Sequence, residues 1–331
     1  MVSMNKFLVF LEQREGIIKK SSIDTWNSVQ ELAGVQGNSI LSGILAGPAD
    51  LHQLEGSLSG DGVIFYASDE KFRLYNPDHY VRLVVDTLKR EACTSLFFAD
   101  TALSRDLAPK LSVCLQASLL SGCSIVDAAN ACGSCSRSVY SGSACASFVP
   151  ERSFRIYTIM PRATQSSSLF SAHPAIITLD PSGFIDSEEL FPLVRRIVMH
   201  QGRPDVAEAG IIIAGGRGMG NANSFELLEK IAMLLGGAVG ASRQAVDEGW
   251  RPHSEQIGQT GKTVAPALYV ACGISGAVQH LAGIGSAGTV VAVNTDPYAP
   301  IFDVADYGIV GDVHLVLPAL HDALQDFLKR Q

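Results

Sequence analysis

The chain has 331 residues, 47% of them hydrophobic, and a formal net charge of −8. That length is enough for two domains of ordinary size. No apolar run reaches the roughly 18 residues of a membrane-spanning helix. The pI near 5.5 and the mean hydropathy of +0.21 argue against a surface for nucleic acid or anionic membranes. We therefore expect a two-domain protein that neither binds nucleic acid nor inserts into a membrane.

The first residues carry one early lysine, Lys6, and then enter the apolar run at 6–12. We interpret this run as the first strand. It leaves no room for the long apolar core of a secretory signal or for an Arg-rich transit peptide. A cytoplasm like that of bacteria is the simplest expectation that follows, and a matured organellar chain would look the same.

Seven cysteines make an odd number, which favours free thiols over a disulfide framework. Cys132 and Cys135 form a CxxC pair, and Cys123 and Cys145 flank it. A zinc or iron–sulfur site would need four ligands at suitable spacing. Only one pair is close and no histidine lies nearby, so we expect no metal site.

Strand-like and helix-like runs alternate over residues 1–200, which predicts an α/β domain. The predicted strands lie at 6–12, 39–47, 62–68 and 95–100, and a helix at 79–92. Residues 101–122 are predicted as loop and then helix. Leucines recur there at i+4 and should face the sheet, at positions Leu107, Leu111, Leu115 and Leu119.

Residues 136–160 contain β-rich runs, interpreted as edge strands that close this first domain. Residues 161–188 are rich in Pro, Ser and Thr and indicate a connector. The pattern places a domain boundary near 201–204, so we expect domains at 1–200 and 201–331.

The C-terminal half contains four short apolar runs that end in small or polar residues, at 209–218, 237–243, 267–277 and 289–296. A helical pattern follows the first run at 221–235. Short Ile-, Val- and Ala-rich runs alternating with helices predict an open, mostly parallel sheet. Ligands of such sheets bind beyond the carboxyl ends of the strands.

Several residues at those ends suit a long ligand with phosphates and hydroxyls. Ser275 and Gly276 are predicted to open a helix whose free N–H groups would hold a pyrophosphate, with Ser275 as its cap. Arg217 lies in a second glycine turn and could neutralise negative charge. Either turn is equally compatible with a plain strand–helix connection. Asp312 could accept from a ribose hydroxyl or cap the final helix.

Six motifs occur in one order: GGRG (215–218), GASR (240–243), QIGQTGK (256–262), GISGAVQH (273–280), NTDP (294–297) and DVADYGIVGD (303–312). This set closely resembles the α subunit of electron transfer flavoproteins. The first domain is similar to that family in pattern, including its RDLAPKL stretch at 105–111. The resemblance implies two Rossmann-like α/β domains. The N-terminal one would be a scaffold that contacts a β subunit, and the C-terminal one would bind FAD.

The resemblance also implies roles for single residues. Arg243, always charged, would lie over the flavin ring, Thr260 would meet its reactive nitrogen, and His280 would donate to a ring carbonyl. Asn294 and Asp312 would hold the AMP portion. Taken singly, a histidine on an apolar helix is more often structural, and an arginine is more often solvated. The full expected FAD set is Arg217, Ser242, Arg243, Ile257, Gly258, Gln259, Thr260, Ser275, Gly276, Ala277, Val278, Gln279, His280, Asn294, Asp312 and Val313.

The function implied is that of an electron carrier without catalytic residues of its own. It would accept electrons from flavin dehydrogenases, such as the acyl-CoA dehydrogenases of fatty acid β-oxidation, and pass them to a quinone reductase or a ferredoxin-type acceptor. One alternative is the α subunit of an electron-bifurcating complex that oxidises NADH. The version with an added N-terminal ferredoxin domain is not expected, because the chain begins with its first strand. Another alternative is a non-redox scaffold for NADP or thiamine diphosphate.

Overall fold

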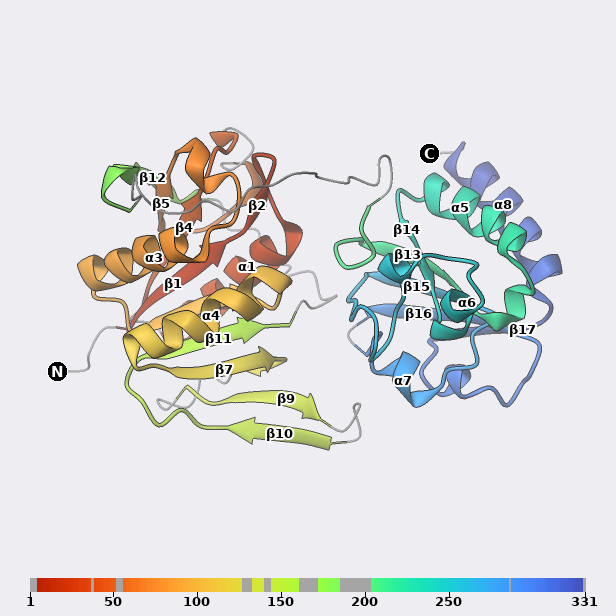
Figure 1. The fold of residues 1–331 in the computed structure, drawn as a ribbon. Helices are drawn as coiled ribbons and strands as arrows, with labels where there is room; N and C mark the ends of the chain where they lie inside the picture. Colours follow the sequence, from red (N-terminus) through yellow and green to blue (C-terminus); the bar gives the residue numbers. More distant parts are fainter. Residues whose placement is uncertain are drawn as a thin grey trace. The chain divides into compact units, whose positions relative to one another are not determined.

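The computed structural model describes residues 5–36, 39–51, 56–126, 133–139, 144–160, 172–184, 204–285 and 287–329. The chain forms two compact units (Figure 1), and the described residues from 204 onward belong to the second. Each unit has its own parallel sheet flanked by helices, which confirms the predicted fold class. The predicted boundary at 201–204 falls largely on residues outside the described part of the chain. Most of the predicted connector at 161–188 lies outside it too.

A seven-stranded sheet forms the centre of the first unit. Its strand pairings are all parallel. Interior strands of this kind are buried on both faces and are therefore apolar along their length. In sheet order the strands are β12 (Ala175–Thr178), β5 (Val63–Ala67), β4 (Ser39–Ala46), β1 (Asn5–Leu11), β6 (Ser95–Ala99), β11 (Arg155–Ile159) and β7 (Ser118–Cys123).

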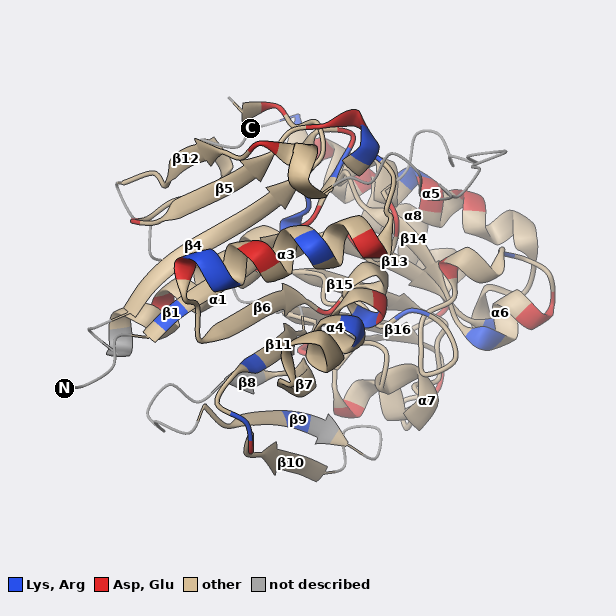
Figure 2. Ribbon diagram, turned by 60° about the vertical axis from the view of Figure 1, so that its left-hand side comes forward, with Lys and Arg blue, Asp and Glu red and all other residues tan. Residues whose placement is uncertain are grey.

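Among the described residues of this unit, three long helices pack on the sheet: α1 (Lys20–Gln36), α3 (Pro77–Glu91) and α4 (Ala102–Leu115). The start of α3 is fixed by Asn76, whose side chain accepts from the N–H of Asp78, and by Pro77 at the first helical position. Acidic and basic residues follow one another along α3 (Figure 2), and Asp78, Arg82, Asp86 and Arg90 are exposed. Its inner face buries Leu83, Val84 and Leu88 in the core.

The helix predicted within 101–122 begins earlier and ends earlier than expected. Thr101 caps it and exchanges hydrogen bonds with Ser104, so α4 starts at once with no preceding loop. The helix ends where Gln116 adopts a left-handed conformation, with φ of 49°. Leu107 and Leu111 are buried as predicted. Leu119 instead belongs to β7, because the chain has already turned into the sheet.

The β-rich segment at 136–160 is also different from the prediction. β9 (Cys135–Val139) and β10 (Ala144–Phe148) form a separate small sheet with β8 (Ile125–Val126). β11 is no edge strand, because it lies between β6 and β7 and four of its five residues are buried. A short antiparallel ribbon, β2 (Gln13–Arg14) and β3 (Ile17–Ile18), follows β1.

The second unit has a five-stranded parallel sheet, and the four apolar runs of the sequence form four of its strands. The chain goes from β13 to β14 on one side and then crosses to β15 on the other. The carboxyl ends of β13 and β15 are therefore the switch point where open sheets bind ligands. The strands in sheet order are β14 (Ala238–Ala241), β13 (Ile211–Gly215), β15 (Leu268–Cys272), β16 (Thr289–Asn294) and β17 (Tyr307–Val310).

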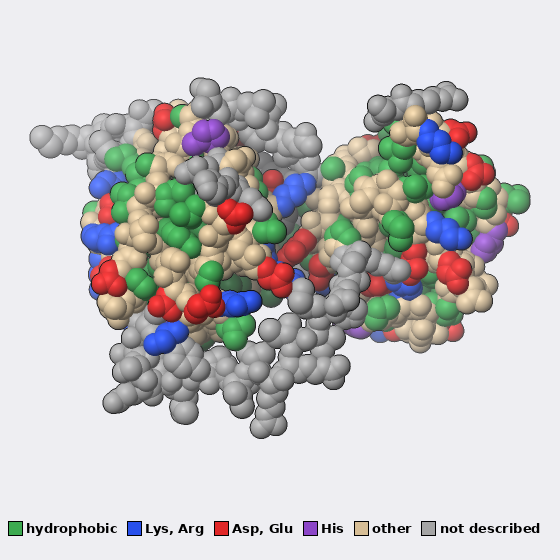
Figure 3. Space-filling model, turned by 90° about the horizontal axis from the view of Figure 1, so that it is seen from above, with side chains coloured by type: hydrophobic (Ala, Val, Ile, Leu, Met, Phe, Trp, Pro, Cys, Tyr) green, Lys and Arg blue, Asp and Glu red, His purple; other side chains and the backbone are tan. Residues whose placement is uncertain are grey.

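Helix α5 (Phe225–Leu234) follows a 3₁₀ turn at Ala222–Ser224, so the helix predicted at 221–235 is confirmed. It packs beside α8 (Val313–Leu328) on one face of the sheet. Two short helices, α6 (Arg243–Asp247) and α7 (Val278–Leu281), follow β14 and β15. On the face of this unit seen in Figure 3, charged side chains of both signs lie among hydrophobic ones. Within the described residues, no helix has both the length and the apolar character to cross a membrane.

Candidate functional site

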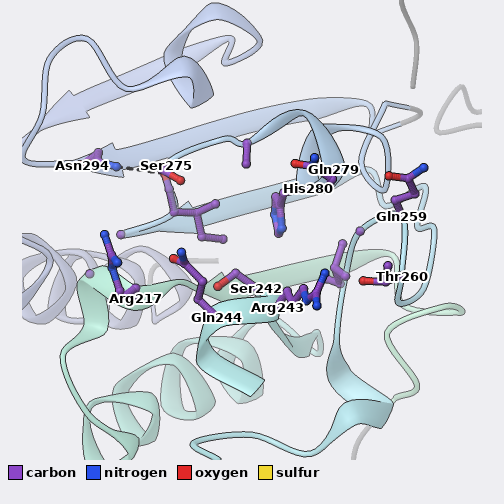
Figure 4. Close-up of a pocket in the computed structure, with 16 residues that line it drawn as sticks. Arg217, Ser242, Arg243, Gln244, Gln259, Thr260, Ser275, Gln279, His280 and Asn294 are labelled. Atoms are coloured by element: carbon purple, nitrogen blue, oxygen red, sulfur yellow. Dashed lines mark hydrogen bonds between the residues drawn. The ribbon is translucent and has the colours of Figure 1, made fainter. Parts of the chain in front are cut away.

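A cavity of about 440 Å³ opens beyond the carboxyl ends of β13 to β16 in the second unit (Figure 4). It lies at the switch point of the sheet, where the sequence predicts a ligand. Its walls are loops and short helix starts rather than the strands themselves. The lining residues are Arg217, Gly218, Ser242, Arg243, Gln244, Ile257, Gly258, Gln259, Thr260, Gly273, Ile274, Ser275, Ala277, Gln279, His280 and Asn294.

Two glycine turns cross at the floor of this cavity. The N–H of Gly218 donates to the carbonyl of Gly273 over 3.0 Å. A Cβ on Gly216 would lie 2.3 Å from that carbonyl oxygen, and one on Gly273 would lie 2.8 Å from the Cα of Gly218. Gly273 also has φ of +62°, which side chains disfavour. The glycines are thus required for the two strand ends to meet closely enough to form the site.

Arginines stand toward both ends of the cavity (Figure 4). Arg217 is exposed in the 3₁₀ turn Arg217–Met219 after β13. Arg243 begins α6, where the side chain of Ser242 accepts from the N–H of Ala245 over 3.5 Å. The Arg243 side chain is 67% exposed, and its Nε lies 3.4 Å from Asp247 Oδ2. Such an exposed ion pair is weak, so most of the field of Arg243 remains available to an anion in the cavity.

The loop at 257–260 forms another part of the cavity lining, and hydrogen bonds hold it to the segments on both sides. The N–H of Ile257 donates to Ala241 over 2.9 Å, and that of Gln259 donates to Gln279 over 2.7 Å. The buried Gln256 donates from Nε2 to Thr260 Oγ1 over 3.0 Å. Thr260 is exposed at the loop tip, as predicted, with its hydroxyl proton free to turn toward a ligand.

His280 lies in the cavity wall with its ring almost fully buried, 7% exposed. Its Nε2 lies 2.9 Å from the hydroxyl of Tyr269. Desolvation lowers the pKa of His280 to about 4, and the nearby backbone of Ile257 opposes that shift in part. Its Nδ1 is buried without a partner at hydrogen-bonding geometry among the described residues. The ring is therefore neutral near pH 7, and one of its nitrogens is unsatisfied.

The helix after β15 begins later than the sequence suggests. Ser275 is not its cap, because α7 starts at Val278 and Ala277 occupies the cap position without a side-chain bond. Ser275 does line the cavity. The backbone of Gly276, with φ of +84°, approaches Ile301, whose N atom would lie 2.3 Å from an added Cβ. The glycine thus serves a contact within the protein, where the sequence suggested an approach to the ligand.

Asn294 and Asp312 end up in different surroundings. Asn294 lines the cavity, donates to the carbonyl of Ile274 over 2.9 Å and accepts from the N–H of Asp296 over 3.0 Å. Asp312 caps α8 by accepting from the N–H of His314 over 2.9 Å. Of the two roles that the sequence allows for Asp312, the structure displays the cap.

Twelve of the sixteen predicted residues line the cavity, and Gly276, Val278, Asp312 and Val313 do not. Four lining residues were absent from the predicted set: Gly218, Gln244, Gly273 and Ile274. Gln244 follows Arg243 in α6. Its place beside a residue predicted to bind FAD was the one sequence signal that could have added it to the set. The other three lie within the quoted motifs GGRG and GISGAVQH, but they belong to the crossing of the two turns, which involves residues distant in sequence.

Of the cysteine cluster, Cys132 lies outside the described residues. Cys123 and Cys135 are buried in the first unit, and their thiols hydrogen-bond each other, which raises the pKa of Cys123 and lowers that of Cys135. Within the described chain, no group of three or more His, Cys, Asp or Glu residues could hold a metal ion.

The cavity fits an elongated anionic ligand with acceptor atoms. It offers two arginines, the hydroxyls of Ser242, Ser275 and Thr260, and the unsatisfied Nδ1 of His280. A buried donor without an acceptor is unfavourable until a ligand or water supplies one. FAD carries a pyrophosphate that the arginines can neutralise, and it carries hydroxyls and a ring with carbonyl and nitrogen acceptors that can pair with the donors. It therefore fits the chemistry of the cavity.

Comparison with known proteins agrees with this fit. Residues 205–285 match the family model described as the electron transfer flavoprotein FAD-binding domain, and residues 7–181 match the electron transfer flavoprotein domain. The first match contains nearly all of the cavity, and the second spans more than half of the chain.

Two curated relatives extend over nearly all of the sequence. A protein named FixB from Clostridium saccharobutylicum is 35% identical over 320 residues, covering 94% of each chain. The electron transfer flavoprotein subunit alpha of Bacillus subtilis is 35% identical over 319 residues, covering 95% of this chain and 96% of its own. The chain therefore belongs to the electron transfer flavoprotein α-subunit family, and its cofactor is FAD.

Proposed function

We propose that this chain is the FAD-binding α subunit of a heterodimeric electron transfer flavoprotein and works as an electron carrier with a β subunit. The observation that carries the proposal is the cavity at the switch point of the second sheet, where arginines and hydroxyls converge. In this proposal the first unit does not bind FAD. It is the scaffold that contacts the β subunit, and the domains divide at 200/201.

The residues divide into two groups along the cavity (Figure 4). Arg217, Ser275 and Asn294 lie toward one end and suit the phosphates and ribose. Arg243, Gln259 and Thr260 lie toward the other and suit the ring. FAD supplies the electron-accepting chemistry. Arg243 favours extra negative charge beside it, and the Thr260 hydroxyl can donate to a ring nitrogen. The proposed FAD set also includes six further residues of the lining, Ser242, Ile257, Gly258, Ala277, Gln279 and His280, together with Gly276, Val278, Asp312 and Val313, which lie outside the lining.

The proposed donors are flavin dehydrogenases, such as acyl-CoA dehydrogenases of fatty acid β-oxidation, and the proposed acceptor is a quinone-reducing or ferredoxin-type protein. The proposed location is the cytoplasm. Carriage of electrons requires no nucleophile or general base from this chain. The FAD-binding family match removes the case for a colourless scaffold that holds NADP or thiamine diphosphate.

The test uses the heterodimer purified with its β subunit. We expect a yellow protein whose flavin is reduced when an acyl-CoA dehydrogenase and its substrate are added, and which NADH alone does not bleach. Bleaching by NADH would indicate the bifurcating alternative instead. A complex that shows no flavin spectrum would contradict both.

A further inference from the structure

Tyr269 lies in β15 directly behind the His280 ring. Its side chain is 0% exposed, and its hydroxyl oxygen lies 2.9 Å from His280 Nε2. Its ring packs at a tilt to the imidazole, with 6.1 Å between the centroids. Tyr269 does not line the cavity, so any effect on a ligand there must pass through His280.

The direction of this hydrogen bond decides which nitrogen of His280 carries a proton. If the hydroxyl donates to Nε2, the ring proton sits on Nδ1. If Nε2 carries the proton and donates to the oxygen, the hydroxyl proton needs another acceptor. Among the described residues, Nε2 is the partner found for that hydroxyl. A fully buried hydroxyl proton without an acceptor is disfavoured, so the first arrangement is favoured.

The protonation states of both groups are consistent with it. Burial raises the pKa of Tyr269 well above its ordinary value, so the phenol keeps its proton. Burial lowers the pKa of His280 to about 4, so the ring carries one proton and not two. The Ile257 backbone near the ring raises the pKa of His280, which favours a ring N–H over a bare nitrogen on that side. A neutral imidazole has one donor and one acceptor, and here the acceptor is committed to Tyr269.

We propose that Tyr269 is a positioning residue of the FAD site: its hydroxyl donates to His280 Nε2 and holds the imidazole as the neutral Nδ1–H tautomer in the cavity wall. His280 thereby contributes an uncharged N–H donor to the wall, and Arg243 supplies the charge. The same bond anchors α7, to which the loop at 257–260 is tied through Gln279. The inference rests on FAD occupying this cavity, as the proposed function requires.

The first test observes the tautomer directly. The heterodimer is prepared with ¹³C,¹⁵N-histidine in this chain, and ring chemical shifts are recorded with FAD removed and with FAD bound. The His280 signals are assigned by their loss in His280→Asn. We expect the Nδ1–H form in the unaltered chain and a mixture of both tautomers in Tyr269→Phe. A proton on Nε2 in the unaltered chain would overturn the proposal, and this result does not depend on the folding of Tyr269→Phe.

The second test separates positioning from packing by the flavin reduction potential. Tyr269→Phe should make the potential more negative, because the ring can turn its donor away from the site. Asparagine at position 280 keeps an N–H close to the place of Nδ1, so Tyr269→Phe should have little effect in a His280→Asn background. Equal shifts in both backgrounds would contradict the proposal, because Tyr269 would then act through packing alone.

Tyr80→Phe is the matched control. Tyr80 is a buried phenol of the first unit whose hydroxyl donates to the carbonyl of Phe72 over 2.9 Å. The Tyr80→Phe variant should lose a comparable hydrogen bond without any change in the flavin potential. Different results would contradict the proposed function and the role of Tyr269. A heterodimer without flavin contradicts the assignment of FAD to the cavity, whereas bound flavin with the proton on Nε2 contradicts the role of Tyr269 alone.

Discussion

At the scale of single residues, the charge at the end of the cavity near the 257–260 loop is set by Arg243 and by the carboxylate beside it. The guanidinium is never deprotonated, and Asp247, 3.4 Å away, offsets only part of its field because both side chains are about two-thirds exposed. Arg217 carries the second positive charge of the lining, toward the other end of the cavity, and His280 is neutral near pH 7. The balance between Arg243 and Asp247 is therefore the main electrostatic control at the end of the cavity proposed for the flavin ring.

Arg243→Ala should make the FAD potential more negative and leave most FAD bound, since reduction adds electrons beside a lost cation. Asp247→Ala is the matched variant and should move the potential the other way. Because solvent screens exposed charges, we expect each effect to be roughly 1 kcal/mol. Redox titration of the two heterodimers measures both, and unchanged potentials would show that the arginine does not face the ring.

The buried His280 predicts a loss of stability in mild acid. Its pKa falls from 6.5 in the unfolded chain to about 4 in the folded one. Between these two pH values His280 is mostly protonated in the unfolded state and mostly neutral in the folded state. The free energy of unfolding therefore falls as pH falls. The full difference is about 3 kcal/mol. Urea unfolding should give a steeper decline toward acid for the unaltered protein than for His280→Asn, and parallel declines would contradict the burial argument.

At the scale of elements, the site depends on how strand ends and helix starts meet. The apolar runs predicted four strands of the second sheet correctly, because burial on both faces is visible in local sequence. The start of α7 was not predictable, since Ser275 and Gly276 look like a helix cap until Ile301 is placed against them. Arg155–Ile159 likewise became an interior strand through pairing with strands distant in sequence.

The crossing of the two glycine turns gives an element-scale prediction with a close control. Gly273 and Gly236 have nearly the same φ, +62° and +64°, but a Cβ would meet Gly218 at the first and nothing within 4 Å at the second. Both alanine variants should lose about 1 kcal/mol from the strained backbone. Only Gly273→Ala should also weaken FAD binding, measured by flavin fluorescence. Equal affinities would mean that the floor can yield.

The start of α8 distinguishes a cap from a cofactor contact. Asp312→Ala should lower the free energy of unfolding by about 1 kcal/mol, because the N–H of His314 loses its acceptor. Asp312→Asn should restore most of it, since asparagine is an equally good cap. We expect the FAD dissociation constant to stay the same in both. A clear rise in that constant for Asp312→Ala would show that the carboxylate also holds the cofactor.

At the scale of the whole molecule, the sequence motifs predicted which domain holds the cavity, but they did not predict the contacts that form it. Twelve of the sixteen lining residues belong to the predicted FAD set, because the turns that follow parallel strands gather at one edge of the sheet. It missed Gln244, Gly218, Gly273 and Ile274, which reach the cavity only through the packing of separate turns. The Tyr269–His280 bond joins residues eleven positions apart on a strand and a helix, and no periodicity indicates it.

The central claim is that FAD lies at the switch point of the second sheet with its ring beside Arg243. The most direct measurement is a crystal structure of the heterodimer purified with its native flavin. The account predicts ring density between Arg243 and the loop at 257–260, with the pyrophosphate toward Arg217. Flavin bound only elsewhere in the complex, or Arg243 turned away from the ring, would contradict it.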